Sequence, residues 1–137
     1  MDADVISLFE PECGDELICT SYTWHQLAQG ITLTGATPVF AGINFWNSSL
    51  SPNKGALKVS PRTQAILAGN TNGQPVTWAT RRKLAIELGL KLIEDITEAF
   101  GLRYQDRTVV SFGDVSVFDF SAPSALCTGE GAGAAIY

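Results

Sequence analysis

The sequence predicts a single α/β domain, residues 1–137, built on a mostly parallel β-sheet. Short apolar runs such as Leu92-Ile93 have no polar face, which is typical of parallel strands buried on both sides. These runs alternate with segments of helical character, an order that favours a parallel sheet covered on both faces. The chain is 45% hydrophobic and 17% charged, as expected of a globular domain without an internal boundary.

The first third of the chain is expected to supply a helix end, a strand and a second helix. Residues 4–9 form the tail of a helix that Pro11 stops, and residues 16–19 form a short buried strand. The next helix runs through Trp24 and ends at Gly35. Hydroxyl groups available to cap its N-terminus belong to Thr20, Ser21 and Thr23.

The middle of the chain continues the alternation. Residues 37–41 predict a second strand, and 45–61 an irregular stretch with a short helix over 52–59. A third strand is expected over 64–68, followed by a loop over 69–75.

Residues 76–89 predict an amphipathic helix. Its apolar face is expected to comprise Trp78, Leu84, Ala85 and Leu88. The opposite, polar face is expected to carry Arg81, Arg82 and Glu87.

Three further strands complete the predicted sheet. They cover residues 91–94, 115–120 and 132–137. A turn is expected at 104–107, and a glycine-rich turn at 128–131 precedes the last strand.

Charge and composition exclude several classes of function. The net charge is −5 and the longest basic run is residues 81–83, which argues against nucleic acid or an anionic membrane as a partner. No apolar segment approaches the 18 residues of a membrane span, and the acidic N-terminus predicts no secretory leader.

Cysteine and histidine usage points to a cytoplasmic protein without a metal site. Cys13, Cys19 and Cys127 are widely spaced and form no CxxC motif, which is typical of reduced thiols inside the cell. The single histidine, His25, has no second ligand at a suitable spacing. We therefore expect it at or near the surface of a helix.

Asp95 is the candidate functional residue that the local pattern offers. It follows the predicted strand 91–94, and ligands of open α/β sheets bind beyond the carboxyl ends of the strands. The alternative is that Asp95 caps the next turn.

Five blocks of the sequence resemble, in order and spacing, the DegT/DnrJ/StrS family of nucleotide-sugar aminotransferases. The blocks are residues 14–24, 35–40, 73–75, 92–101, and a set formed by 111–114, 118–120 and 128–131. Members of that family are pyridoxal-phosphate (PLP) enzymes of the aspartate-aminotransferase fold. The resemblance covers nearly the whole chain.

The resemblance implies part of the large domain of a PLP-dependent transferase. Its fold is then a three-layer α/β/α sandwich with a six-stranded sheet, five strands parallel and the last antiparallel. The last strand, without the outer neighbour that the family's seven-stranded sheet provides, is expected at an exposed edge. Such an edge invites pairing with another chain, so we expect a homodimer.

The resemblance also assigns roles at the site. Asp95 matches the acid that pairs with the pyridine nitrogen of PLP, and Trp24 matches the aromatic residue that stacks on the ring. Glu98 and Asp119 complete the vestigial cofactor site that it implies. For Trp24 the alternative is a core-facing helix residue, and for Asp95 and Glu98 it is ordering of the loop.

Departures from the family pattern oppose catalysis. The position of the lysine that holds the cofactor is Ser124, and a serine hydroxyl cannot form a Schiff base. Asp119 matches a serine that contacts the phosphate in the family. A carboxylate about 4 Å from a phosphate oxygen would be repelled by about 4 kcal/mol per unit charge, which lowers the affinity for the cofactor about a thousandfold. Asn70 replaces a family histidine, and Gly42 and Asn44 replace two acids.

Two larger parts of the family enzyme also have no counterpart in this sequence. These are the Gly-Ser or Gly-Thr turn whose backbone amides hold the phosphate, and the C-terminal small domain.

The sequence thus predicts a catalytically inactive aminotransferase-like domain with no catalytic residue and no cofactor. Its role would be ligand-binding, regulatory or vestigial, with a small molecule as the expected ligand. The alternative is a DegT-type subunit that binds PLP and is completed in trans by a partner chain. A third hypothesis is PLP chemistry that needs no lysine, such as dehydration.

Overall fold

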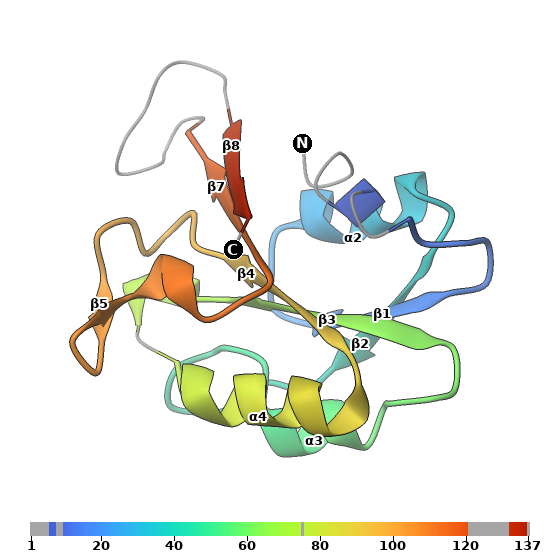
Figure 1. Ribbon diagram of the computed structural model, residues 1–137, viewed down its shortest axis with the longest axis horizontal. Coiled ribbons are helices and arrows are strands. Elements are labelled where there is room, and N and C mark those ends of the chain that lie inside the picture. The colour runs from blue at the N-terminus through green and yellow to red at the C-terminus, as the bar shows by residue number, and fades with distance from the viewer. Residues whose placement is uncertain (1–5, 8–9, 75, 121–131, 137) are drawn as a thin grey trace.

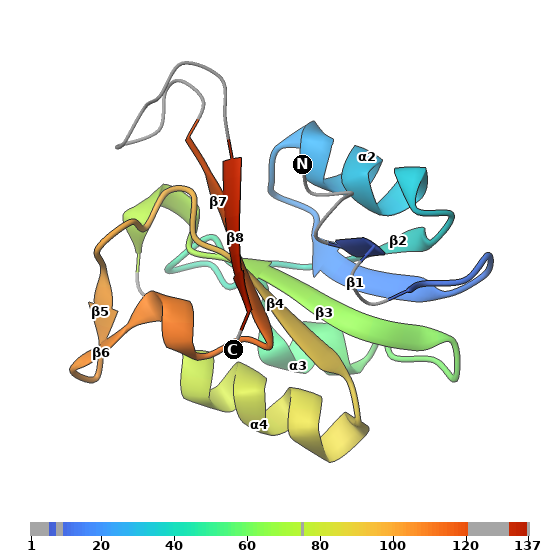
Figure 2. The same cartoon turned by 45° about the horizontal axis from the view of Figure 1, so that its top comes forward.

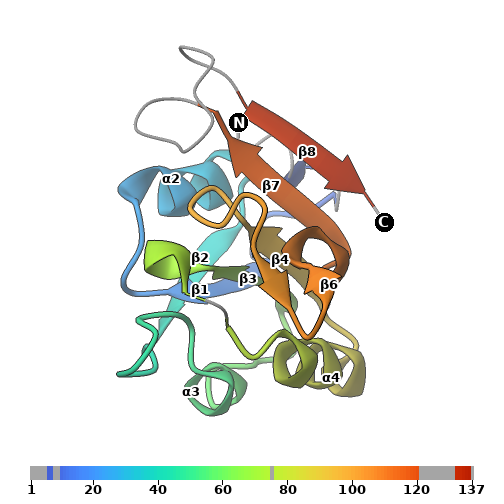
Figure 3. The ribbon, with the colours of Figure 1, turned by 90° about the vertical axis from the view of Figure 1, so that its left-hand side faces the viewer.

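The computed structural model describes residues 6–7, 10–74, 76–120 and 132–136, and these form one α/β domain around a six-stranded sheet (Figure 1). The strand order is β2-β1-β3-β4-β7-β8. Neighbouring strands are parallel except β7 and β8, which are antiparallel. The bounds are β1 (Glu16–Thr20), β2 (Thr37–Ala41), β3 (Thr63–Gly69), β4 (Lys91–Asp95), β7 (Val115–Asp119) and β8 (Ala132–Ile136). The predicted sheet, with its antiparallel last strand at an edge, is confirmed (Figure 3).

Helices cover both faces of this sheet, which confirms the three-layer architecture (Figure 2). Helix α2 (His25–Leu33) lies on one face, and α3 (Pro52–Ala56) and α4 (Trp78–Leu88) lie on the other. The helix expected over 52–59 is therefore shorter than predicted.

Smaller elements follow the third and fourth strands. They are the 3₁₀ turns η1 (Thr71–Gly73) and η2 (Val109–Ser111) and the hairpin of β5 (Arg103–Tyr104) and β6 (Arg107–Thr108). The turn predicted at 104–107 is the tip of this hairpin.

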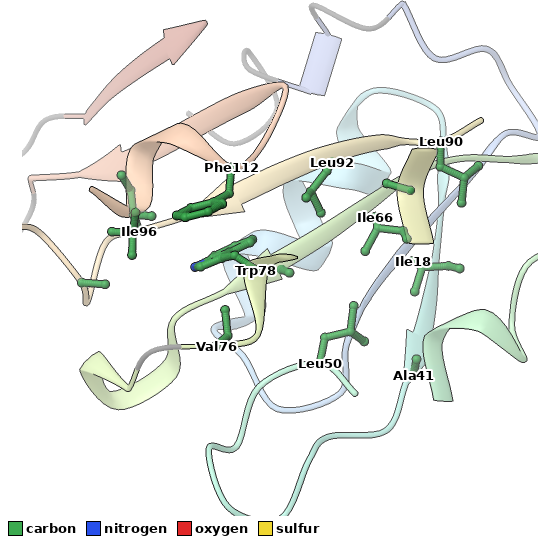
Figure 4. Packing of buried hydrophobic residues seen from close by; sticks show 14 residues of the cluster. Ile18, Ala41, Leu50, Ile66, Val76, Trp78, Leu90, Leu92, Ile96 and Phe112 are labelled. Atoms are coloured by element: carbon green, nitrogen blue, oxygen red, sulfur yellow. The ribbon is translucent and has the colours of Figure 1, made fainter. Parts of the chain in front are cut away.

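Two apolar clusters hold the layers together, one on each face of the sheet. Leu92 packs with Trp78 and Phe112 on the α4 side, where the two aromatic rings stack 6.3 Å apart (Figure 4). Ile93 belongs to the cluster beneath α2, with Ile31. Adjacent residues of β4 join opposite clusters because successive side chains of a strand point to opposite faces.

The start of α2 differs from the prediction. Its N-cap is Trp24, and no side chain caps the helix. The hydroxyl of Thr20, one of the three expected caps, instead accepts a hydrogen bond from the Tyr22 amide at 3.2 Å. The predicted end is correct: Thr34 is the C-cap, and Gly35 follows with a φ of 88° that favours glycine.

The polar face predicted for α4 is wrong at Arg81, which is only 1% exposed. Its guanidinium group donates hydrogen bonds to the Leu50 carbonyl and, at 3.3 Å, to Ser49 Oγ. Leu88, expected on the buried face, is 41% exposed. The face that α4 buries is thus set by the 42–51 loop beside it as well as by the sheet.

Candidate functional site

The candidate site lies at the edge of the sheet where the parallel strands end. Asp95 is the last residue of β4, and its neighbours in register are Gly69 of β3 and Val117 of β7. Because these strands are parallel, the loops that follow them emerge together, as in other open α/β sheets. The structure therefore places Asp95 where the sequence predicted it.

Asp95 is half-buried and orders the turn that follows it. Its Oδ1 accepts a hydrogen bond from the Thr97 amide at 3.0 Å, so the interpretation of Asp95 as the cap of a turn is correct in its geometry. Burial raises the pKa of Asp95; the hydrogen bonds from Thr97 oppose this, and the charges of Glu98 and Asp119 raise it further. The same carboxyl group thus caps a turn and lies in a negative environment.

Glu98 and Asp119 join the loops around Asp95. The exposed Glu98 carboxylate accepts a hydrogen bond from the Asn72 amide in the loop after β3. At the end of β7, the Asp119 amide donates to Thr97 Oγ1 at 3.2 Å. The structure brings the three predicted acids to one loop cluster, with Thr97 between two of them.

Thr97 is the residue of this cluster that the sequence analysis missed. Its amide binds Asp95, and its hydroxyl receives the amide of Asp119, so it joins the ends of β4 and β7. A threonine two residues after a strand-end aspartate is a signal for such a turn. The link to Asp119 has no local signal, because 22 residues separate the two partners.

Trp24 lies in the segment between β1 and α2, at the same edge of the sheet. Its side chain is 58% exposed, so the core-facing alternative for this residue is wrong. Tyr22, in the same segment, is 52% exposed. An exposed aromatic ring beside a ligand site can act as a stacking surface.

Asn70 connects the site to the core beneath it. It is buried, its backbone amide donates to the Asp95 carbonyl at 3.2 Å, and its Oδ1 accepts from Trp78 Nε1 at 3.1 Å. Its Nδ2 has no hydrogen-bond partner. Asn70 therefore supports the backbone of Asp95 from the α4 side of the sheet.

The lysine side chains lie away from Asp95, and all four lysines of the chain are in described segments. Lys91 begins β4, roughly 13 Å along the strand from Asp95. Lys54 Nζ donates to the Ile43 carbonyl, just after β2. Strand β2 is three positions from β4 in the sheet, which separates the two strands by roughly 14 Å.

The other two lysines are equally remote from the carboxyl end of β4. Lys83 lies on α4, 3.7 Å from Glu87, and Lys58 precedes the amino end of β3.

These residues fit only part of a PLP molecule. Asp95 can face a ring nitrogen and Trp24 can stack, but no lysine lies beside them to bind the aldehyde. The charge of Asp119, which helps to raise the pKa of Asp95, is unfavourable to a phosphate. Ser124 and the 128–131 turn lie outside the described residues.

The single histidine, His25, is exposed at the start of α2, as expected. Within the described ranges, no group of three His, Cys, Asp or Glu residues is arranged to hold a metal ion. No described helix is long and apolar enough to cross a membrane.

The sequence matches a known family. A profile of the DegT/DnrJ/EryC1/StrS aminotransferase family matches residues 4–136. The chain belongs to this family. Its resemblance to nucleotide-sugar aminotransferases, and the fold that this implied, are thereby confirmed.

Relatives and solved structures agree with this assignment. The spore coat polysaccharide biosynthesis protein SpsC of Bacillus subtilis is 37% identical over 118 residues, which are 86% of this chain and 30% of that protein. GDP-perosamine synthase of Escherichia coli O157:H7 is 35% identical over 86% of this chain and 32% of its own length. An aminotransferase from Psychrobacter cryohalolentis superimposes with a TM-score of 0.93 at 27% identity, over 98% of this chain and 35% of the other. The chain therefore spans about a third of the length of the proteins it matches.

Proposed function

We propose that this chain is an aminotransferase-like domain that does not catalyse transamination by itself and instead binds a small molecule at the Asp95 edge. The observation that carries the proposal is the position of the four lysines, none of which lies at the carboxyl end of β4. Transamination by PLP requires an amine that holds the cofactor and moves a proton. A serine at the family's lysine position, Ser124, agrees with this.

The charge of the site supports the same proposal. Asp95, Glu98 and Asp119 belong to one loop cluster. The charges of Glu98 and Asp119 raise the pKa of Asp95. A dianionic phosphate placed there would be repelled, whereas a neutral or cationic ligand would not. A role in ligand binding or regulation is therefore better supported than one in PLP catalysis.

Borohydride reduction in the presence of PLP tests the proposal. We expect the intact mass of the wild-type chain to show no stoichiometric adduct. As a matched control, the double variant Ser124→Lys/Asp119→Ser restores the family's residues at both positions and is expected to gain one adduct at the introduced lysine. A stoichiometric adduct on one native lysine of the wild type would contradict the proposal.

The second candidate is a DegT-type sugar aminotransferase subunit that a partner chain completes. The observation that favours it is length, because the chain spans about a third of its relatives. A neighbouring gene that encodes the phosphate turn, the lysine and the small domain would be its signature. Co-expression of the two products should then give a complex that absorbs visible light with PLP, and purification as separate, colourless proteins would exclude it.

We also propose that the chain forms a cytoplasmic homodimer. Strand β8 lies at the edge of the sheet and pairs with β7 on one side only, among the described strands. An edge strand of this kind can pair with a second chain. Sedimentation analysis should show a dimer that Ala134→Lys weakens, since charged side chains on an edge oppose pairing. A monomer at high micromolar concentration would contradict the proposal.

A further inference from the structure

Glu94 is a carboxylic acid buried in the apolar layer between the sheet and η2. It lies on β4, its exposed fraction is 0%, and Leu92 on the same face of the strand and Ile96 just after the strand belong to one apolar cluster. Its Oε1 has no hydrogen-bond partner, and its Oε2 lies 2.9 Å from Ser116 Oγ. A bare oxygen is tolerable on a neutral carboxylic acid but costly on a buried carboxylate.

The hydroxyl of Ser116 has two acceptors within reach and one proton to donate. Glu94 Oε2 lies 2.9 Å away, and the carbonyl oxygen of Val110, in η2, lies 3.3 Å away. If Glu94 is ionised, Ser116 can satisfy only one of them. If Oε2 carries a proton, Glu94 donates to Ser116, and Ser116 donates to Val110, so that both short distances are used.

We propose that Glu94, Ser116 and the Val110 carbonyl form a proton-controlled latch that holds η2 against β4 and β7. In the closed state the Glu94 hydroxyl donates to Ser116 Oγ, and the Ser116 hydroxyl donates to Val110 O. When a base in the solvent removes the Glu94 proton, the Ser116 hydroxyl turns to the carboxylate, and the Val110 carbonyl loses that donor. The latch adjoins Asp95 but does not depend on the proposed function.

The backbone around Glu94 leaves little room for another arrangement. A Cβ atom at Gly113 would lie 2.8 Å from Glu94 Cγ and 2.8 Å from the Leu92 carbonyl oxygen. Glu94 and Ser116 are also direct partners in the register of β4 and β7. The carboxyl group is thus held beside the serine by packing on both sides.

Burial and the groups around Glu94 have opposite effects on its pKa. Burial raises the pKa of Glu94 to about 7, opposed by the Ser116 hydroxyl, by the nearby amides of Phe112 and Gly113, and by the charge of Arg107. Arg107, from the β5–β6 hairpin, lies over the Phe112 ring at 4.6 Å.

The remaining charges of the neighbouring elements are engaged elsewhere. On α4, Arg81 binds the Leu50 carbonyl, and Arg82 pairs with Asp114 at 2.8 Å. On β4 itself, Asp95 points to the opposite face of the sheet from Glu94. The latch is therefore expected to switch near neutral pH.

Infrared spectroscopy of the wild-type chain tests the protonation directly. We expect a carbonyl band of a protonated carboxylic acid at pH 6 that disappears with a midpoint near pH 7. The band should be missing in Glu94→Gln and unchanged in Glu87→Gln, which alters an exposed acid of α4. Absence of the band at pH 6, or its persistence in Glu94→Gln, would overturn the proposal.

Amide NMR tests the connection to η2 and does not require the Glu94 variant to fold. The Val110 and Phe112 signals should titrate with the same midpoint as the infrared band. In Ser116→Ala the carboxylic-acid band should remain while the titration of the Val110 signal is lost, because the serine transmits the change to Val110. The Phe112 amide, which acts on Glu94 directly, should still titrate in this variant. Titration of the Val110 signal in Ser116→Ala as in the wild type would show that no latch exists.

Discussion

At the scale of single residues, Asp95 has two roles that substitution can separate. Its Oδ1 caps the turn through the Thr97 amide, while burial and the charges of Glu98 and Asp119 oppose its ionisation. Asparagine keeps the acceptor and removes the charge, whereas alanine removes both. We expect Asp95→Asn to be as stable as the wild type at pH 7 or up to about 1 kcal/mol more stable, and Asp95→Ala to lose about 1 kcal/mol.

Urea unfolding of the two variants at pH 7 measures this difference. If Asp95→Asn loses as much stability as Asp95→Ala, the negative charge itself stabilises the fold, and the interpretation that burial and the neighbouring charges oppose the ionisation of Asp95 is wrong.

The atoms packed around Gly113 leave no room for a side chain at this position. An alanine Cβ there would lie 2.8 Å from Glu94 Cγ and from the Leu92 carbonyl oxygen, and 2.9 Å from the Val115 carbonyl oxygen. Two of these neighbours are backbone atoms that cannot turn away. We expect Gly113→Ala to lower the free energy of unfolding by about 3 kcal/mol, measured by urea denaturation.

Gly55 provides the matched control for this prediction. It lies in α3, and a Cβ there would meet no atom closer than 3.9 Å. Gly55→Ala should therefore raise the stability by about 1 kcal/mol through helix propensity. Equal changes in stability at the two positions would contradict the prediction that close contacts at Gly113 exclude a side chain.

At the scale of elements, α4 is fixed to the 42–51 loop through the buried Arg81. The guanidinium group binds the Leu50 carbonyl and Ser49 Oγ and lies 5.7 Å from the centre of the Trp78 ring, but its Nε and Nη1 have no partner. Burial lowers the pKa of Arg81 to about 10, opposed by the charge of Tyr104.

The consequence is that the volume of Arg81 should matter more than its charge. We expect Arg81→Ala to destabilise the chain by about 3 kcal/mol, because it leaves a cavity under the loop. Arg81→Met keeps most of the volume and removes the buried charge, so it should cost less than half as much. Thermal and urea unfolding of both variants provide the comparison, and equal losses would show that the hydrogen bonds to the loop dominate.

Arg81 also shows where prediction from the sequence ends. The strands could be located because apolar runs such as Leu92-Ile93 carry a local signal, and the position of Asp95 at the site followed from the strand before it. The burial of Arg81 depends on the Leu50 carbonyl, which is 31 residues away in the chain. Helical periodicity contains no information about such a partner, and it therefore assigned Arg81 to the solvent.

The same limit applies within the site. Asp95, Glu98 and Asp119 could be named from family blocks, but the hydrogen bonds that Thr97 makes between the ends of β4 and β7 required the fold. Trp24 was assigned to a helix with two alternative environments, and only the structure showed it exposed at the N-cap.

At the scale of the whole molecule, the buried acids make stability depend on pH. The pKa of Glu94 is raised by burial from 4.5 to about 7, so the folded chain holds this proton more tightly than the unfolded chain does. Ionisation of such a group lowers the free energy of unfolding. This loss grows as the pH rises from 4.5 to 7 and is complete above the folded pKa. Asp95, whose pKa burial also raises, acts in the same direction.

Asp114 acts in the opposite direction. Burial alone would raise its pKa, but hydrogen bonds from the Leu92 amide and Arg82 lower it below the usual range. Its contribution is present at neutral pH and is lost as the solution becomes acidic. The wild-type stability curve therefore combines groups of both signs, and only a difference between variants isolates Glu94.

Glu94→Gln makes that difference measurable, because glutamine resembles the protonated acid in shape and can donate to Ser116. Every other titrating group is common to both proteins, so the stability of Glu94→Gln relative to the wild type should increase by about 2.5 kcal/mol between pH 5 and pH 8. Urea unfolding at unit steps of pH gives the two curves, and Glu87→Gln should parallel the wild type. If the Glu94→Gln curve also runs parallel to the wild type, Glu94 ionises in the folded chain as easily as in the unfolded one, and burial does not keep it protonated.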